Sequence, residues 1–248
     1  MSSQQISPGG YNLLPPVVKN LLIINGLFYL GTYAFTTLGI DLVKLLGLFV
    51  PQSEFFQPHQ LVSYIFMHGS IDHIFFNMFA LWMFGNTLEN YWGGKRFLIY
   101  YMLTGLGAGL IHLGVLEAQY FSVINQIPEE AVHLIKEEGL QIMETGREFK
   151  EDSWNTLNHV LNIPTVGASG AVFGLLLAFG MMFPNAQIYL YFLFPIRAKY
   201  FVIGYGLLEL FSGVSNRPGD NVAHFAHLGG MLIGFILIKY WQRNRTRF

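Results

Sequence analysis

The alternation of long apolar segments with polar ones is the strongest pattern in the chain. The apolar segments cover residues 18–39, 71–92, 96–117, 163–183, 197–213 and 222–242. A helix needs about 20 residues to cross about 30 Å of hydrocarbon, and only 197–213 is clearly short of that length. An apolar, aromatic stretch from Ile188 to Pro195 precedes it and is expected in the membrane interface. The pattern predicts an all-α membrane protein, a bundle of six transmembrane helices.

Two of the connecting segments are too long to be simple turns. Residues 40–70 are rich in Phe, Gly and Pro, which favours a first outer loop half-embedded in the membrane interface. Residues 118–162 form a polar outer insertion between the third and fourth helices, and Glu129 to Ile142 has the pattern of an amphipathic helix. We expect this insertion to cap the outer face, with substrate gating as the alternative.

Composition and charge narrow the class of protein. Hydrophobic residues make up 52% of the chain and charged residues 12%, which is too apolar for an ordinary soluble domain. The absence of cysteine excludes thiolate metal sites and a cysteine nucleophile. A net charge of −1 without a basic patch indicates no nucleic-acid partner.

The basic residues also predict how the chain is oriented in the bilayer. Most of them fall in tails and loops on one side, which becomes the inner side under the positive-inside rule. Both termini are then cytoplasmic: residues 1–17 form one tail and residues 243–248 a basic second tail, around a membrane domain of residues 18–242. Short termini without the layout of a targeting peptide favour a bacterial inner (plasma) membrane.

A serine and a histidine in different apolar segments suggest hydrolytic chemistry. Ser169 lies in Gly167-Ala168-Ser169-Gly170, and His227 lies in the sixth segment. Counted from the expected helix starts at 1.5 Å per residue, Ser169, His227 and Asn77 share one layer about 8–9 Å deep. Polar groups in lipid are costly and usually functional. We therefore predict Ser169 as a nucleophile and His227 as its base, working as a dyad because no carboxylate has a clear position beside the imidazole.

Glycine spacing supports the approach of these two helices, and a second polar pair completes the candidate site. Small residues repeat every fourth position after both Ser169 and His227, which lets the two helices pack closely. His73 and Asn77 lie on one face of the second helix and are suitable donors to an oxyanion. Phe173 is expected to face lipid or core, with stacking beneath His227 as the alternative.

Metal catalysis is the competing interpretation, because several histidines gather in the outer third of the predicted bundle. Neutral imidazoles can hold zinc, but the chain contains no H-E-x-x-H motif, and Ser169 would then have no role. No metal and no cofactor are predicted.

Taken together, these motifs resemble the rhomboid family of intramembrane serine proteases. The resemblance rests on His68-Gly-Ser, His73-x-x-x-Asn77, Gly167-Ala-Ser169-Gly170 and Ala226-His227-x-x-Gly230-x-x-x-Gly234. It implies a serine endopeptidase that cleaves transmembrane protein substrates near their outer ends, within the lipid bilayer. It also implies that His73, Asn77 and the Ser169 amide form an oxyanion hole, and that Glu89 is a structural hydrogen-bonding group.

Two features depart from the family pattern. In the first outer loop, His59-Gln60 stands in place of a frequent Trp-Arg pair, and the 118–162 insertion is larger than in the compact members of the family. Two alternatives remain from other functional classes. The first is a catalytically inactive rhomboid-like protein for membrane binding or quality control, which would be expected to have lost Ser169 or His227. The second is a transporter, which would be expected to show internal repeats.

Overall fold

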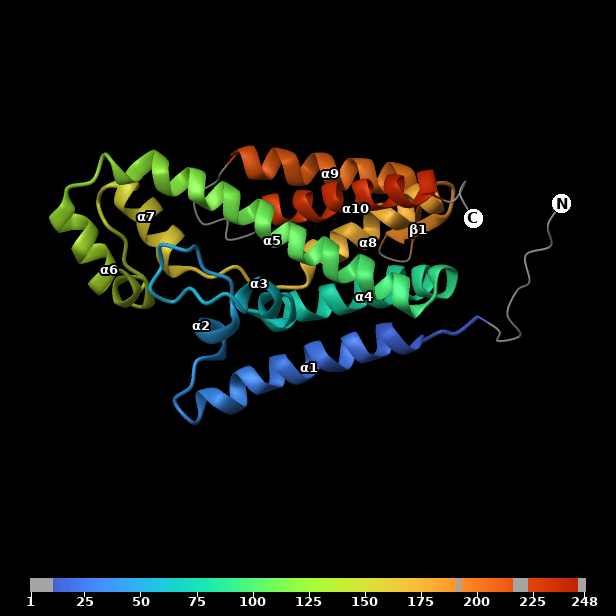
Figure 1. Ribbon diagram of the computed structural model, residues 1–248, viewed down its shortest axis with the longest axis horizontal. Coiled ribbons are helices and arrows are strands. Elements are labelled where there is room, and N and C mark those ends of the chain that lie inside the picture. Colours follow the sequence, from blue (N-terminus) through green and yellow to red (C-terminus); the bar gives the residue numbers. More distant parts are fainter. Residues whose placement is uncertain (1–10, 191–192, 216–222, 245–248) are drawn as a thin grey trace.

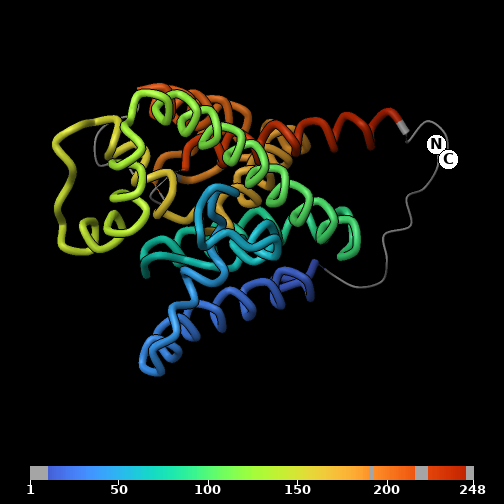
Figure 2. The backbone as a smooth tube through the Cα atoms, turned by 60° about the vertical axis from the view of Figure 1, so that its left-hand side comes forward, coloured from blue at the N-terminus to red at the C-terminus, as the bar shows by residue number. Residues whose placement is uncertain are grey.

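Six helices, at the positions of the six apolar segments, form the body of the protein. The computed structural model describes residues 11–190, 193–215 and 223–244. The six helices are α1 (Pro16–Thr36), α4 (Ile71–Trp92), α5 (Gly94–Ile124), α8 (Ser169–Met182), α9 (Ala198–Ser215) and α10 (His224–Asn244). They lie side by side in both views, and α1 begins at the end of the molecule where α10 finishes (Figure 1, Figure 2). The prediction of a mainly helical protein is confirmed.

Fewer than six helices of the structure are long and apolar enough, taken one by one, to cross a membrane. Within the described residues, α1 and α5 are long and apolar enough to span a membrane, and α8 is apolar but has only 14 residues. Among the described helices, length and composition therefore support α1 and α5 as candidate membrane spans.

The start of α8 differs from the prediction of a helix over 163–183. Thr165 and Leu48 exchange two backbone hydrogen bonds of 2.8 and 2.9 Å, and the Gly167 N–H donates to the Tyr64 carbonyl at 2.9 Å. These bonds hold the segment before Ala168 in a non-helical conformation, Ala168 is the N-cap, and the helix begins at Ser169. The helical rise counted from Pro164 therefore does not apply to Ser169, while the predicted start of the sixth helix at Asn221 lies outside the described residues. In the described part of α10 (His224–Asn244), His227 lies in the first turn.

The first outer loop is organised around Gln60. The loop contains α2 (Leu42–Leu46), α3 (Gln60–Ser63) and the 3-10 helix η1 (Tyr64–Phe66). The fully buried Gln60 side chain donates to the Phe55 carbonyl at 2.8 Å and accepts from the Gln57 N–H at 3.1 Å. The neighbouring His59 Nε2 lies 2.9 Å from the Leu45 carbonyl oxygen. His59 and Gln60, the pair that departs from the family pattern, thus hydrogen-bond to backbone groups of their own loop.

The outer insertion has secondary structure and a small interior of its own. The amphipathic helix predicted over Glu129 to Ile142 is confirmed as α6 (Glu129–Glu144), and an additional helix, α7 (Asp152–Asn162), packs against it. Ile135 and Leu157 are fully buried, and the Asn158 amide donates to the Gly139 carbonyl at 3.0 Å. At 31 residues, or about 46 Å, α5 extends beyond a bilayer core and supports this insertion (Figure 1).

A short hairpin adds two strands to the mainly helical structure, where the sequence analysis expected an apolar stretch in the membrane interface. Strands β1 (Gln187–Leu190) and β2 (Phe194–Arg197) pair antiparallel between α8 and α9, with Ile188 opposite Ile196. Pro184 and Pro195 disfavour a continuous helix through this segment, because each lacks the N–H that a helix requires.

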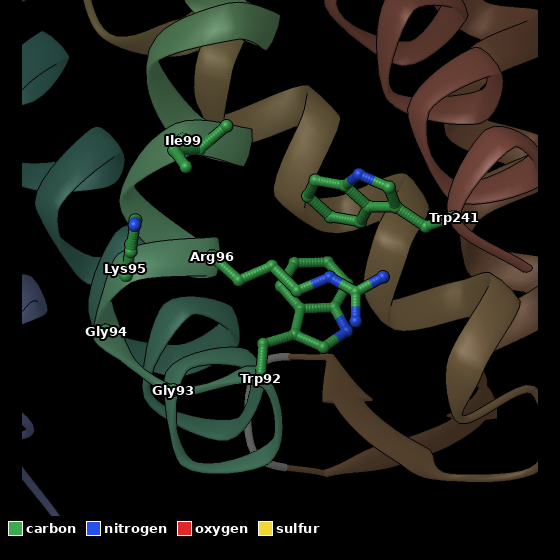
Figure 3. A pocket seen from close by; sticks show the side chains of 7 residues that line it. All are labelled: Trp92, Gly93, Gly94, Lys95, Arg96, Ile99 and Trp241. Atoms are coloured by element: carbon green, nitrogen blue, oxygen red, sulfur yellow. The ribbon is translucent and has the colours of Figure 1, made fainter. Parts of the chain in front are cut away.

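The end of the bundle where α1 begins is held by a buried acid. Glu89 of α4 accepts the Val17 N–H at 3.0 Å and the Val18 N–H at 2.8 Å, two donors that the first turn of α1 leaves without helical partners. Beside it, where α4 ends and α5 begins, is a cavity of about 530 Å³. Its lining residues are Trp92, Gly93, Gly94, Lys95, Arg96, Ile99 and Trp241, and the Arg96 guanidinium lies 4.1 Å from the Trp241 ring centre (Figure 3). None of the predicted site residues lines this cavity.

Candidate active site

Ser169 occupies the first position of α8, after the non-helical segment that contains Gly167. Gly167 has φ +125°, a conformation that side-chain-bearing residues rarely adopt. A Cβ at Gly167 would lie 2.7 Å from His73 Nε2 and 3.6 Å from Ser169 Oγ. The His73 ring and the Ser169 hydroxyl therefore border the same glycine, which only a residue without a side chain can occupy.

His73 and Asn77 lie in the first two turns of α4. Ser70 caps this helix, and its hydroxyl accepts the His73 N–H at 3.2 Å. The buried Asn77 amide donates to the His73 carbonyl at 3.0 Å. An amide nitrogen carries two N–H donors, so this bond leaves Asn77 one donor for a ligand.

His227 is buried against α8 and stacks on Phe173. The two rings lie 4.1 Å apart at an angle of 7°, and Phe173 is one helical turn after Ser169. The alternative expectation for Phe173, stacking with His227, is thus confirmed over a lipid-facing position. Stacking on Phe173 fixes the orientation of the His227 ring relative to α8, the helix that carries Ser169.

Glycines bring the backbones of α8 and α10 into direct contact. Gly230 lies against the Gly170 carbonyl, and a Cβ at Gly234 would lie 3.5 Å from the Gly174 Cα. The predicted small-residue faces are therefore the surfaces through which the two helices meet. Ser169 and His227 lie at the end of this contact where α8 and α10 begin.

A carboxylate that the sequence interpretation overlooked contacts the predicted base. Glu209 Oε2, on α9, lies 2.8 Å from His227 Nδ1 and 2.7 Å from His224 Nδ1. The expectation that no carboxylate is in position beside His227 is wrong. Glu209 was detectable in the sequence as the one acidic residue of an apolar helix, since ionisable residues in such segments are usually functional.

The same three side chains are the candidate for a metal centre within the described residues. The ligand atoms of Glu209, His224 and His227 all lie within 4.8 Å of one another. Two ligands held about 2.0–2.1 Å from a tetrahedral zinc ion lie about 3.3 Å apart. The N–O separations of 2.7 and 2.8 Å are instead those of direct hydrogen bonds.

The serine and the histidine are not joined directly. Within the part of the chain that the structure describes, the Ser169 hydroxyl makes no hydrogen bond to His227 or to another residue. Such bonds are often long without substrate and tighten when it binds.

His68 lies beside this site and is almost completely buried, with 1% of its surface exposed. Its ring centre is 5.0 Å from that of His73, and among the described residues neither of its ring nitrogens has a hydrogen-bond partner. Burial, with a smaller contribution from repulsion by His73, lowers the pKa of His68 to about 4. His68 is therefore neutral at physiological pH.

These features define a helical protein with a serine and two histidines gathered from three different helices. The description "Rhomboid domain" belongs to the family model that matches residues 56–243, and the chain belongs to the rhomboid family. The resemblance seen in the sequence motifs is confirmed.

The curated relatives that it matches are longer proteins, and the chain spans about half of their length. "RHOMBOID-like protein 12, mitochondrial" of Arabidopsis thaliana is 28% identical over 77% of this chain and 48% of the relative. "Rhomboid protein 1, mitochondrial" of Saccharomyces cerevisiae is 26% identical over 75% of this chain and 44% of the relative. A mitochondrial rhomboid protein of Schizosaccharomyces pombe is 24% identical over 74% of this chain and 52% of the relative. The expectation of a bacterial plasma membrane is contradicted by these matches to mitochondrial proteins.

Proposed function

We propose that the protein is an intramembrane serine endopeptidase with Ser169 as nucleophile and His227 as general base. The observation that carries the proposal is the position of Ser169 at the start of α8, beside the His73 ring, with His227 stacked on the same helix at Phe173. Membership of the rhomboid family supports it independently.

In this proposal all six helices of the body cross the bilayer, with both termini on the inner side. The pattern of apolar segments supports this arrangement, as does the common end at which α1 begins and α10 finishes (Figure 1). The names of the mitochondrial relatives favour a mitochondrial membrane. The substrates are transmembrane proteins that enter from the lipid and unwind near their outer ends.

The reaction proceeds through an acyl-enzyme. Ser169 Oγ attacks the substrate carbonyl carbon while its proton moves to His227 Nε2. The same proton then passes to the leaving amine nitrogen as the peptide bond breaks. Water loses a proton to His227 and its oxygen attacks the ester carbonyl carbon. His227 then returns that proton to Ser169 Oγ as the ester C–O bond breaks, which releases the acid product and the free serine.

The negative charge on the tetrahedral oxygen requires nearby donors. The remaining Asn77 N–H, the His73 ring and the Ser169 backbone amide are the proposed set, and the Ser169 amide is one of those that the first turn of α8 leaves without a helical partner. Each such donor contributes about 10²–10³ in rate.

A fluorophosphonate probe, which reacts with activated serines, tests the proposal without knowledge of the substrate. We expect labelling of the purified wild type at Ser169, by intact mass and peptide mapping, and none in Ser169→Ala or His227→Ala. Ser122→Ala, an exposed serine on α5, is the matched control and should label like the wild type.

Cleavage of a transmembrane reporter in liposomes should follow the same order of activity. A folded wild type that neither labels nor cleaves would support the alternative function, an inactive rhomboid-like protein for membrane binding or quality control.

A further inference from the structure

We propose that Glu209 is a positioning residue that acts through His227, so that the site works as a serine–histidine–glutamate triad. The inference rests on the proposed function and extends it to a residue on α9 that the motifs of the other helices do not include. Glu209 contacts the base and not the substrate, so its effect is on the orientation and charge of the imidazole.

Burial of both side chains strengthens the hydrogen bond between Glu209 and His227. Glu209 is 6% exposed and His227 is 8% exposed, so little water competes for the bond between them. Glu209 is also the one acidic residue of α9. Burying an unpaired carboxylate is costly, and the hydrogen bonds from His224 and His227 offset that cost.

The geometry selects one tautomer of the base. An ionised carboxylate can only accept hydrogen bonds, so His227 Nδ1 must carry the proton in the 2.8 Å bond to Oε2. The other nitrogen, Nε2, is then unprotonated and able to take the proton from Ser169 Oγ. During that step the Nδ1 proton stays on the imidazole, and the Glu209 charge stabilises the imidazolium that forms.

The other ionisable groups around this pair come from four helices. His224 on α10 shares the same oxygen, Tyr205 on α9 lies close enough to interact electrostatically with Glu209, and His73 on α4 and His112 on α5 do so with His227. Of the described ionisable groups in this cluster, Glu209 is the one with a negative charge, so it supplies the counter-charge for a protonated His227.

A purely structural role would tie α9 to α10 without affecting the chemistry, and the pH profile separates the two roles. The experiment measures the second-order rate of fluorophosphonate labelling of Ser169 from pH 5 to 9 in the 248-residue chain. Glu209→Gln should lower the plateau rate by about 10²–10⁴-fold, because the imidazolium loses its counter-charge. Its acidic limb should also move to lower pH, since the neutral amide no longer favours the protonated base.

Two further variants keep the test decisive. Glu209→Asp retains the charge at a greater distance and should recover part of the rate and the wild-type acidic limb, even if Glu209→Gln does not fold. His224→Asn replaces the second imidazole but keeps an amide N–H that can donate to Glu209, so it should change the rate by no more than a few-fold, with the profile unmoved. Thermal melting in detergent shows that each variant is folded.

The outcomes are distinguishable from failure of the proposed function. A wild type that does not label overturns the protease itself. A labelling wild type with a folded Glu209→Gln of equal rate and profile overturns the role of Glu209 alone. Loss of wild-type labelling on treatment with EDTA, with recovery on addition of zinc, would assign the three side chains to a metal ion and also overturn it.

Discussion

Gly230 of α10 packs against the backbone carbonyl of Gly170 of α8, and no side chain fits between the two residues. Gly170 directly follows Ser169, and Gly230 lies one turn after His227. The contact therefore fixes the separation of the proposed nucleophile and base through the backbone, without a bond between their side chains.

Gly230→Ala is expected to disturb both stability and chemistry. Its Cβ would overlap the Gly170 carbonyl, which backbone movement must relieve, and overpacking of this kind costs about 1–3 kcal/mol. We expect a lower melting temperature and loss of most fluorophosphonate labelling. Gly114→Ala is the matched control, because Gly114 also lies inside a helix but has open space around its Cβ position. Unchanged labelling in folded Gly230→Ala would show that the close approach of α8 and α10 does not set the site.

Asn77→Ala should slow turnover more than it weakens substrate binding. The Asn77 amide is proposed to bond an oxygen that becomes negative only during the reaction, so kcat should fall about 10²–10³-fold with KM nearly constant. Asn25→Ala is a close control, since the buried Asn25 amide also donates to the carbonyl four residues earlier, on α1. It should reduce stability and leave kcat per folded molecule unchanged. Equal effects of the two variants on kcat would remove Asn77 from the oxyanion hole.

Glu89→Gln should reduce stability without changing the active site. Glu89 accepts two backbone N–H groups of α1, and a hydrogen bond to a charged group contributes about 1.5–3 kcal/mol. The amide can accept one of these bonds but presents donors to the other. We expect a clearly lower melting temperature and a wild-type pH profile of labelling. Glu138→Gln, on the exposed face of α6, should melt like the wild type.

The positions of the helices and of the motif residues could be predicted from the sequence, but the structure of the segments that connect the helices could not. Apolar periodicity locates the six helices because burial in core or lipid needs a continuous apolar face. It cannot locate the start of α8, which depends on pairing between Thr165 and the distant Leu48. The hairpin after α8 was missed for the same reason, because its strands are short and stabilised by each other.

In the candidate site, the contact between Glu209 and His227 could not be predicted from the sequence. The motifs around Ser169, His73 and His227 could be recognised because their spacing along the chain is informative. Glu209 has no motif, and its partner is 18 residues away on another helix, so only the packing of α9 on α10 brings the two together. A lone acid in an apolar helix was the available signal.

The pH dependence of stability provides a final prediction, from His68. In the folded protein burial lowers the pKa of His68 to about 4, whereas an unfolded histidine titrates near pH 6.5. The unfolded chain then binds the extra proton first as the pH falls. The stability linked to His68 is present above about pH 6.5 and is lost as the pH decreases toward 4. We expect His68→Leu, which removes the buried imidazole, to show a shallower fall in melting temperature between pH 7 and 4 than the wild type. His133→Gln, on the exposed side of α6, should retain the wild-type slope. If His68→Leu and the wild type lose stability in parallel, His68 is already solvated or paired in the folded protein, and its burial does not govern the acid limit.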